Sequence, residues 1–397
     1  MRFREGKVPA TTLAGLALLS ALVYLAVERF QVDVRESGYK EKRAASLAAR
    51  KGQDAIRAAR KRGSPAIQLN HEQDPAQTGL IGTDDQAGEL TTDKGYLRAK
   101  QIATQPNLAA VITGFLKEAK IQKGDIVAVG MTGSFPGANL ATICAIEAME
   151  ARPLVITSIG SSTFGANQAE FTWLDMEKAA FDAGCIRTRS IAASIGGDKD
   201  KGIGLNKSAI DQIRAAIARN GIEKIEEKTL VDSISRRMEV YTKAAGGIEN
   251  VKCYVNIGGG LASVGSNLVG DKLIPTGLSK TWVQKNYPTY GVLLKMLKAG
   301  KPVIHLMDFR KIADDHGLST LPASPGEAGE GPLFISRKYN LVLVLGALLG
   351  LIATIIAVGL LDLRHALFGR PTPSPAQPKV EVPPESLKPP DGGETVL

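Results

Sequence analysis

The chain has 397 residues, enough for one large domain or two ordinary ones. It carries 49 lysines and arginines against 40 acidic residues, and the net charge of +9 favours a polyanionic partner or a membrane surface. Only 5% of the residues are aromatic and the sequence holds no nucleic-acid-binding motif, so we do not expect nucleic acid as a partner.

Two apolar segments are long enough to cross a bilayer, because about 20 apolar residues suffice. The first, residues 9–27, follows a basic N-terminal tail at residues 1–8, and the second covers residues 339–362. The first also fits a signal peptide but lacks a good cleavage site, and the second also fits a buried core helix. We interpret both as spans in the cell membrane, with both termini on one side. The basic start favours cytoplasmic termini and an extracytoplasmic domain.

Four further segments are defined by composition. Residues 28–64 are rich in alanine, lysine and arginine and predict a helical stalk that continues the first span. This stalk is either an electropositive track for a polyanion or a solvated spacer. Residues 65–317 predict an α/β domain that opens with an extended loop. Residues 318–338 form a Pro/Gly linker, and the Pro-rich tail at residues 363–397 is predicted to be disordered.

Within the domain, short apolar strands alternate with longer helices. The strands are predicted at residues 126–129, 153–157, 186–193, 251–257 and 302–307, and the helices at residues 94–103, 108–120, 139–150, 169–182, 207–220 and 233–245. This alternation predicts an α/β fold with a doubly wound, mostly parallel, Rossmann-like sheet flanked by the two transmembrane helices. The Gly-rich region at residues 258–288 is either a binding loop or a short antiparallel insertion.

Two strand-to-helix corners are nearly alike. Residues 127–139 and 155–167 each run from an apolar strand through a Gly/Ser/Thr loop to Gly-Ala-Asn, and a third Gly-rich corner follows residue 256. Such corners present amides and hydroxyls to an anionic ligand, although they are also compatible with plain packing turns. The candidate substrate-binding residues are Thr132, Gly133, Ser134, Asn139, Ser161, Ser162, Thr163, Asn167, Asp175, Gly258, Gly259 and Gly260.

A hydrolase at these corners would need a base. Ser134 is the candidate nucleophile and His305 the candidate base, with Asp175 or Asp308 as third member, but a histidine in an apolar strand is also a common core residue. On the predicted helices, Asp175 fits equally a helix-dipole partner. Arg236 and Arg237 fit either a carboxylate clamp or a solvated helix face. No residue spacing predicts a metal site, and we expect no cofactor.

Five segments carry a resemblance to a known family. They are residues 74–83 (Asp-Pro-Ala-Gln-Thr-Gly-Leu-Ile-Gly-Thr), 90–100, 133–137, 161–167 (Ser-Ser-Thr-Phe-Gly-Ala-Asn) and 171–176. Together they resemble the poly-gamma-glutamate system protein family, whose members are membrane-anchored and associated with synthesis and export of this polymer. The resemblance covers about residues 9–305 and carries no catalytic assignment.

The resemblance implies an accessory protein of poly-γ-glutamate biosynthesis or export, with the polymer or another polyanion, the membrane and the membrane-bound synthase subunits as partners. Two alternatives stay open. One is a γ-glutamyl hydrolase or transferase with Ser134 as nucleophile, and the other is a non-catalytic scaffold for the synthase.

Overall fold

The computed structural model describes residues 9–62, 70–84, 90–265, 274–281, 289–320 and 327–368. The chain divides into two compact units, which are Met1–Val32 with Lys338–Leu397, and Asp33–Arg337. The predicted basic tail at residues 1–8 lies outside the described residues, as does most of the Pro-rich tail predicted from residue 363. The last helix continues to Phe368, so residues 363–368 are helical and not disordered.

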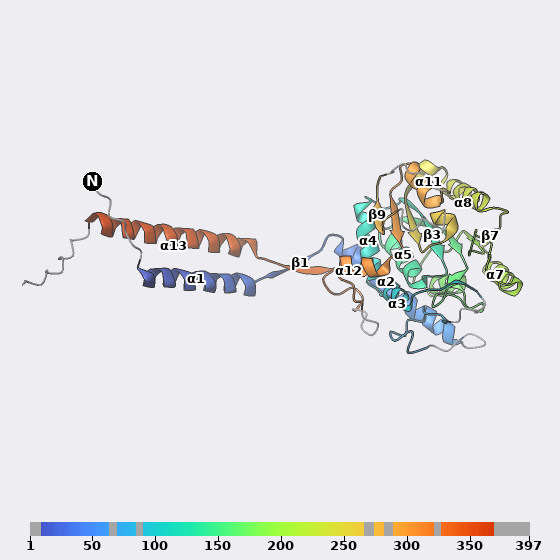
Figure 1. Cartoon of the computed structure of the whole chain (residues 1–397), viewed down its shortest axis with the longest axis horizontal. Helices are drawn as coiled ribbons and strands as arrows, with labels where there is room; N and C mark the ends of the chain where they lie inside the picture. The colour runs from blue at the N-terminus through green and yellow to red at the C-terminus, as the bar shows by residue number, and fades with distance from the viewer. Residues whose placement is uncertain are drawn as a thin grey trace, which may run out of the picture. The chain divides into compact units, whose positions relative to one another are not determined.

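The first unit contains two apolar helices that contact each other, α1 (Ala10–Arg29) and α13 (Leu341–Phe368) (Figure 1). Both are long and apolar enough to cross a membrane, and none of the residues in their most apolar windows is buried. The Tyr339 hydroxyl donates to the Glu28 carboxylate at 2.8 Å, beside the start of α13 and the end of α1. The two apolar helices predicted from the sequence are therefore present.

The second unit is built on a sheet of seven strands in the order β7-β6-β4-β3-β8-β10-β9. All neighbours are parallel except β9, which runs antiparallel to β10 at one edge. The order reverses between β3 and β8, because the chain leaves β3 through β4, β6 and β7 and returns to the other side of β3. The strands are β3 (Ile126–Thr132), β4 (Arg152–Ser158), β6 (Ala192–Ser194), β7 (Glu223–Ile225), β8 (Val251–Ile257), β9 (Gly277–Ser279) and β10 (Val303–Leu306).

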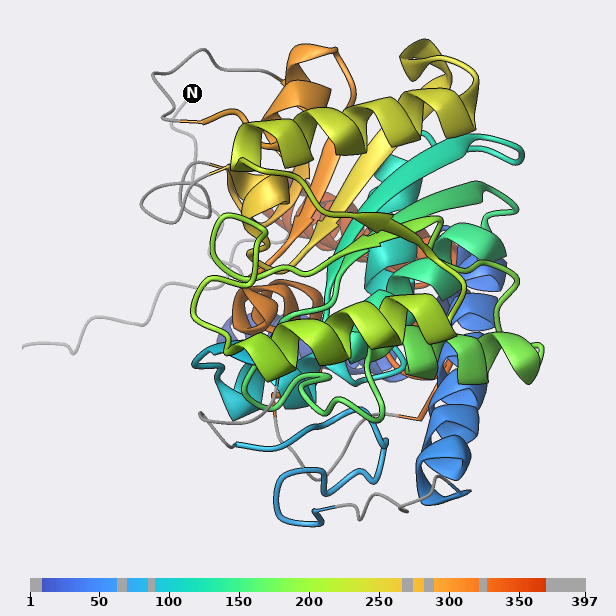
Figure 2. The ribbon, with the colours of Figure 1, turned by 90° about the vertical axis from the view of Figure 1, so that its right-hand side faces the viewer.

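Helices cover both faces of this sheet (Figure 2). Alternate residues of β3 point to opposite faces, so Val127 and Val129 join one apolar cluster and Ala128 joins another. The first cluster includes α4 (Leu108–Glu118), α5 (Pro136–Ala148) and α12 (Phe309–His316), and the second includes α8 (Leu230–Ala245), α9 (Leu261–Val264) and α11 (Val292–Lys298). A third cluster joins α6 (Trp173–Asp182) to α7 (Lys207–Arg219). A mostly parallel sheet buried on both faces explains the nearly unbroken apolar runs of its central strands.

The predicted stalk at residues 28–64 has a different structure. The helix α1 ends at Arg29, β1 (Val32–Arg35) pairs with β11 (Ile335–Lys338), and a separate helix α2 (Tyr39–Arg62) follows. The buried face of α2 packs against α4, α5 and α6 through residues at helical spacing, namely the small residues Ala45, Ala49 and Gly52 and the larger Ile56. The basic segment is therefore a helix of the α/β unit with its charged face outward, and its predicted end at residues 63–64 lies outside the described residues.

The strand predicted at residues 186–193 is wrong except for its end. The backbone N–H of Arg187 donates to the Glu147 carboxylate at 2.8 Å, and that of Ser190 donates to Glu177 at 2.8 Å. Because these donors bind carboxylates, the chain joins the sheet only at Ala192. The strand β7 and the helices α11 and α12 were not predicted, and α3 (Leu97–Ala103) starts three residues later than expected. The antiparallel strand β9 lies within residues 258–288, where a short antiparallel insertion was one of the two alternatives.

Candidate functional site

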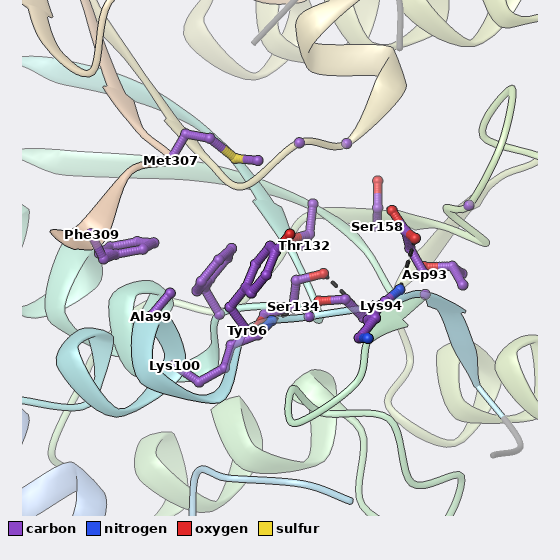
Figure 3. A pocket seen from close by; sticks show the side chains of 18 of the residues that line it. Asp93, Lys94, Tyr96, Ala99, Lys100, Thr132, Ser134, Ser158, Met307 and Phe309 are labelled. Carbon is purple, nitrogen blue, oxygen red and sulfur yellow. Dashed lines mark hydrogen bonds between the residues drawn. The ribbon is translucent and has the colours of Figure 1, made fainter. Parts of the chain in front are cut away.

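A cavity of about 930 Å³ lies at the carboxyl edge of the sheet, beside the reversal of strand order between β3 and β8. Thr132 ends β3 and Ser158 ends β4, and these two residues are paired in the sheet register. Open α/β sheets bind ligands at this position because strands diverge there and loops supply polar groups. Figure 3 shows Thr132, Ser134 and Lys100 on one side of the cavity and Met307 and Phe309, which follow β10, on another.

One wall of the cavity comes from the segment that precedes the sheet, residues 92–100. The short strand β2 (Thr91–Asp93) pairs in parallel with β5 (Ser161–Ser162), and the Thr163 N–H donates to the Asp93 carbonyl at 3.0 Å. The Gly95 N–H donates to Thr163 Oγ1 at 2.7 Å, and a Cβ on Gly95 would lie 2.4 Å from the Thr163 carbonyl oxygen. This close approach fixes the wall and directs α3 toward the cavity.

Lys100, near the end of α3, is the most unusual group at the site. Its side chain is 2% exposed, and Nζ donates to Ser162 Oγ at 2.6 Å and to the Ser134 carbonyl oxygen. Burial disfavours the ammonium and lowers the pKa of Lys100 to about 7. The Phe135 ring, whose centroid lies 4.0 Å from Nζ, favours the charged form and opposes this shift. Within the described ranges, no carboxylate lies within ion-pair distance of Nζ.

The two predicted corners meet at this lysine. The Ser162 N–H donates to Ser134 Oγ at 3.0 Å, so the loop after β3 and the loop after β4 share one polar cluster with Lys100. Both serines are partly exposed and line the cavity. The two corners identified from the sequence therefore lie side by side and contact each other.

A second polar network lies beneath Ser158. Nη2 of Arg237 donates to Ser158 Oγ at 2.9 Å and to Ser194 Oγ at 2.6 Å, and it forms an ion pair with Asp200 at 3.1 Å. Arg237 and Asp200 are both almost fully buried, so each charge compensates the other. Arg237 therefore orients a cavity serine, while Arg236 forms ion pairs with surface glutamates. Neither arginine lines the cavity.

The mouth of the cavity carries three cations, Lys94, Arg98 and Arg310. Over the described part of the chain, none of the three forms an ion pair within 4.0 Å. All three lining carboxylates accept a backbone N–H. Asp93 accepts from Lys94 at 2.7 Å, Asp198 accepts from Lys199 at 2.9 Å, and Asp308 caps α12 by accepting from Lys311 at 3.0 Å. The three rim cations equal the lining carboxylates in number, so the attraction for an anion is local: each rim cation can bind an anionic group of a ligand.

Five of the predicted substrate-binding residues line the cavity, namely Thr132, Ser134, Ser162, Gly259 and Gly260. The other seven do not, and they are Gly133, Asn139, Ser161, Thr163, Asn167, Asp175 and Gly258.

Most of these seven residues support the loops that form the cavity. The Asn139 amide donates to the Thr132 carbonyl at 2.8 Å, and the Asn167 amide binds Thr83 and Thr91. Ser161 Oγ donates to the Ser162 carbonyl at 2.9 Å. These contacts are internal, so the residues shape the site without facing a ligand.

Close packing explains one of the two glycines in the same group, and backbone conformation explains the other. A Cβ on Gly133 would lie 2.3 Å from the Ile159 carbonyl oxygen, and Gly258 has a φ of +83° that favours glycine.

Asp175 and His305 have structural partners away from Ser134. Asp175 closes a capping box with Thr172 at the start of α6 and forms an ion pair with Arg219 at 2.5 Å. His305 is fully buried on β10, where its Nδ1 is hydrogen-bonded to the Asn256 amide at 2.9 Å. Neither residue lines the cavity, so the predicted triad with Ser134 is not assembled.

The cysteines lie apart from the site, with Cys144 and Cys253 buried and Cys185 partly exposed. Among the residues that the structure describes, no three histidine, cysteine, aspartate or glutamate side chains are grouped to hold a metal ion. Comparison with protein-family models, curated proteins and solved structures gave no match, so the chemistry of the cavity carries the functional argument.

Proposed function

We propose that this chain is a membrane-anchored accessory protein of poly-γ-glutamate biosynthesis or export, which binds the polymer or its growing end in the cavity. The observation that carries the proposal is the set of cations at the cavity mouth, Lys94, Arg98 and Arg310, which have no ion-pair partner among the described side chains. Such cations bind carboxylates strongly, and an arginine does so through two parallel hydrogen bonds.

The ligand chemistry matches the two kinds of group around the cavity. A γ-linked glutamate chain carries one free carboxylate per residue and one amide per linkage. The rim cations would bind the carboxylates, while the hydroxyls of Thr132, Ser134 and Ser162 would bind the amides deeper in the cavity. A volume of about 930 Å³ accommodates a short stretch of such a chain. The exposed ring of Tyr96 at the mouth offers an apolar surface to its methylene groups.

The apolar helices α1 and α13 support the anchoring part of the proposal. Each exposes leucines along its length, and side chains of this kind are stable in lipid and costly in water. In the orientation that we propose, the two termini lie in the cytoplasm and the α/β unit lies outside, where exported polymer is present.

The test is binding of labelled poly-γ-glutamate to the full-length protein in detergent, at about 0.02 M and about 0.2 M salt. Binding should weaken at the higher salt, and Arg98→Ala and Arg310→Ala should each weaken it about tenfold. Lys207→Ala is the matched control, because Lys207 is an exposed cation on α7 outside the cavity. Equal effects of all three substitutions would show that the polymer binds by net charge alone and not in the cavity.

The scaffold alternative predicts a different pattern. A scaffold for the synthase would co-purify with its subunits whether or not Arg98 and Arg310 are present, and it would bind no polymer at either salt concentration. That result would overturn the proposal.

A further inference from the structure

The contact between Lys100 and Ser162 has the form of a base and a nucleophile. We infer that the cavity is an acyl-transfer site in which Ser162 is the nucleophile and Lys100 its general base, acting on an amide bond of a γ-glutamyl chain. The choice of a γ-glutamyl amide rests on the proposed function, whereas the Ser–Lys pair rests on the geometry alone. The atoms that carry the inference are Lys100 Nζ and Ser162 Oγ, 2.6 Å apart in a cavity large enough for a substrate.

The surroundings of Lys100 favour its neutral form. An ammonium donates to both Ser162 Oγ and the Ser134 carbonyl. A neutral amine has two N–H groups and one lone pair, so after losing a proton Nζ can keep its donation to Ser134 and accept the hydroxyl proton of Ser162. Its aromatic neighbour Phe135 packs on Phe309 with ring centroids 4.6 Å apart, and this apolar wall covers one side of the amine and reduces its solvation. Burial lowers the pKa of Lys100 to about 7, which is suited to a base at neutral pH.

Among the described residues, no ion pair joins Lys100 Nζ to a charged side chain. The remaining charged side chains that line the same cavity are Asp93, Lys94, Arg98, Asp198, Asp308 and Arg310. Within the described ranges, none of the three carboxylates forms an ion pair with Nζ, so no close counter-charge holds the ammonium in place.

Ser162, and not Ser134, is the serine placed to react. Lys100 contacts the backbone carbonyl of Ser134 but the hydroxyl of Ser162. Ser134 Oγ accepts the Ser162 N–H at 3.0 Å, which leaves the Ser134 hydroxyl hydrogen for the carbonyl oxygen of a substrate. The pairing of β5 with β2 fixes the backbone on both sides of Ser162. The Thr163 N–H donates to the Asp93 carbonyl of β2, and the Ser161 N–H donates to the carbonyl of Leu90, the residue before β2.

The reaction balances without any further reagent than water. Ser162 Oγ attacks the amide carbon while its proton passes to Lys100 Nζ; the amide C–N bond then breaks, and the same proton passes to the leaving amine. Water next attacks the acyl-Ser162 ester and gives one proton to Lys100. The ester C–O bond breaks, Ser162 regains that proton, and a carboxylic acid leaves. An acceptor amine in place of water gives transfer of the acyl group.

A serine-reactive fluorophosphonate probe, applied to the full-length protein in detergent, tests the pair without assuming a substrate. We expect an adduct that peptide mass spectrometry maps to Ser162, and a labelling rate that rises about tenfold from pH 6 to 8 as Lys100 loses its proton. Ser162→Ala should abolish the adduct, and Lys100→Met should slow labelling at least about 100-fold. Ser208→Ala and Lys207→Met are matched controls, because both residues are exposed on α7 outside the cavity.

The pH profile needs no variant, so it remains informative if Lys100→Met fails to fold. An adduct on Ser134, no adduct at all, or a rate that does not change with pH would overturn the inference. Release of new amino groups from γ-linked glutamate oligomers then tests the substrate. Labelling of Ser162 without polymer binding would keep the Ser–Lys site and refute the proposed function, while polymer binding without labelling would do the reverse.

Discussion

Replacing Lys100 by methionine should remove most of a pH dependence that this residue gives to folding stability. In the unfolded chain a lysine keeps its ordinary pKa of 10.5, whereas burial lowers the pKa of Lys100 to about 7. Between these values the unfolded state binds more protons than the folded state, so stability rises with pH. Above pH 10.5 the lysine is neutral in both states and its burial costs no ionisation free energy. As the pH falls toward 7 this cost grows, and the folded state loses stability.

The size of the effect follows from the two pKa values. Integrating proton uptake from pH 7 to 9.5 gives about 3 kcal/mol, out of about 5 kcal/mol for the whole shift. Urea unfolding of the full-length protein in detergent, followed by fluorescence of the buried Trp173, would measure it. The stability of wild type relative to Lys100→Met should rise by about 3 kcal/mol over this pH interval.

The difference between the two proteins cancels other titrating groups, such as Cys144 and Cys253, whose pKa values are raised by burial. The hydrogen bonds lost with Lys100 add a constant to this difference and do not change its slope with pH. Lys207→Met on exposed α7 should show no such slope. A difference between wild type and Lys100→Met that stays constant from pH 7 to 9.5 would refute the argument that Lys100 is buried and neutral.

Three further predictions concern other parts of the chain. Burial raises the pKa of Glu177 from 4.5 to about 7, so the stability it contributes is present below pH 4.5 and is lost as the pH rises through 7. Urea titrations should therefore show wild type losing about 3 kcal/mol of stability relative to Glu177→Gln between pH 4.5 and 7.5. Gly133→Ala should lower stability by about 1–3 kcal/mol, because its Cβ would lie 2.3 Å from a carbonyl oxygen. Gly114→Ala, in open space on α4, should raise stability by up to about 1 kcal/mol. A thermal unfolding measurement that ranks the two variants in the opposite order would contradict the packing. If α1 and α13 both span the membrane, tags on the two termini should be equally protected from an impermeant label in intact cells, while Lys207→Cys should react with an impermeant maleimide. Labelling of one terminus alone would exclude two spans.

The sheet and the two corners were predictable because their signals are local. Apolar runs at Val127 and Val155 mark strands buried on both faces, and Gly-Ser-Thr loops at their ends mark turns at the carboxyl edge. The packed face of α2 also left a local signal, the spacing of Ala45, Ala49 and Gly52, although the charge of this segment obscured it.

The decisive parts of the site depend on contacts between distant segments. Nothing near Lys100 in the sequence separates it from a solvated lysine, because its burial follows from the pairing of β2 with β5 about 70 residues away. Arg237 likewise pairs with Asp200 in three dimensions only. The misplaced strand at residues 186–190 has the same origin, since its N–H groups bind the carboxylates of Glu147 and Glu177.

The pairing of β1 with β11 brings the first and last residues of the α/β unit together, and the Asp33 and Arg337 side chains form an ion pair at 3.7 Å there. A segment whose two ends meet can be removed or inserted without pulling apart the chain on either side. Residues 33–337 therefore form a cassette within a helical hairpin. A short linker could join α1 to α13 after the cassette is excised. In a circular permutant of the cassette, residues 33 and 337 could be joined and new termini made in another surface loop.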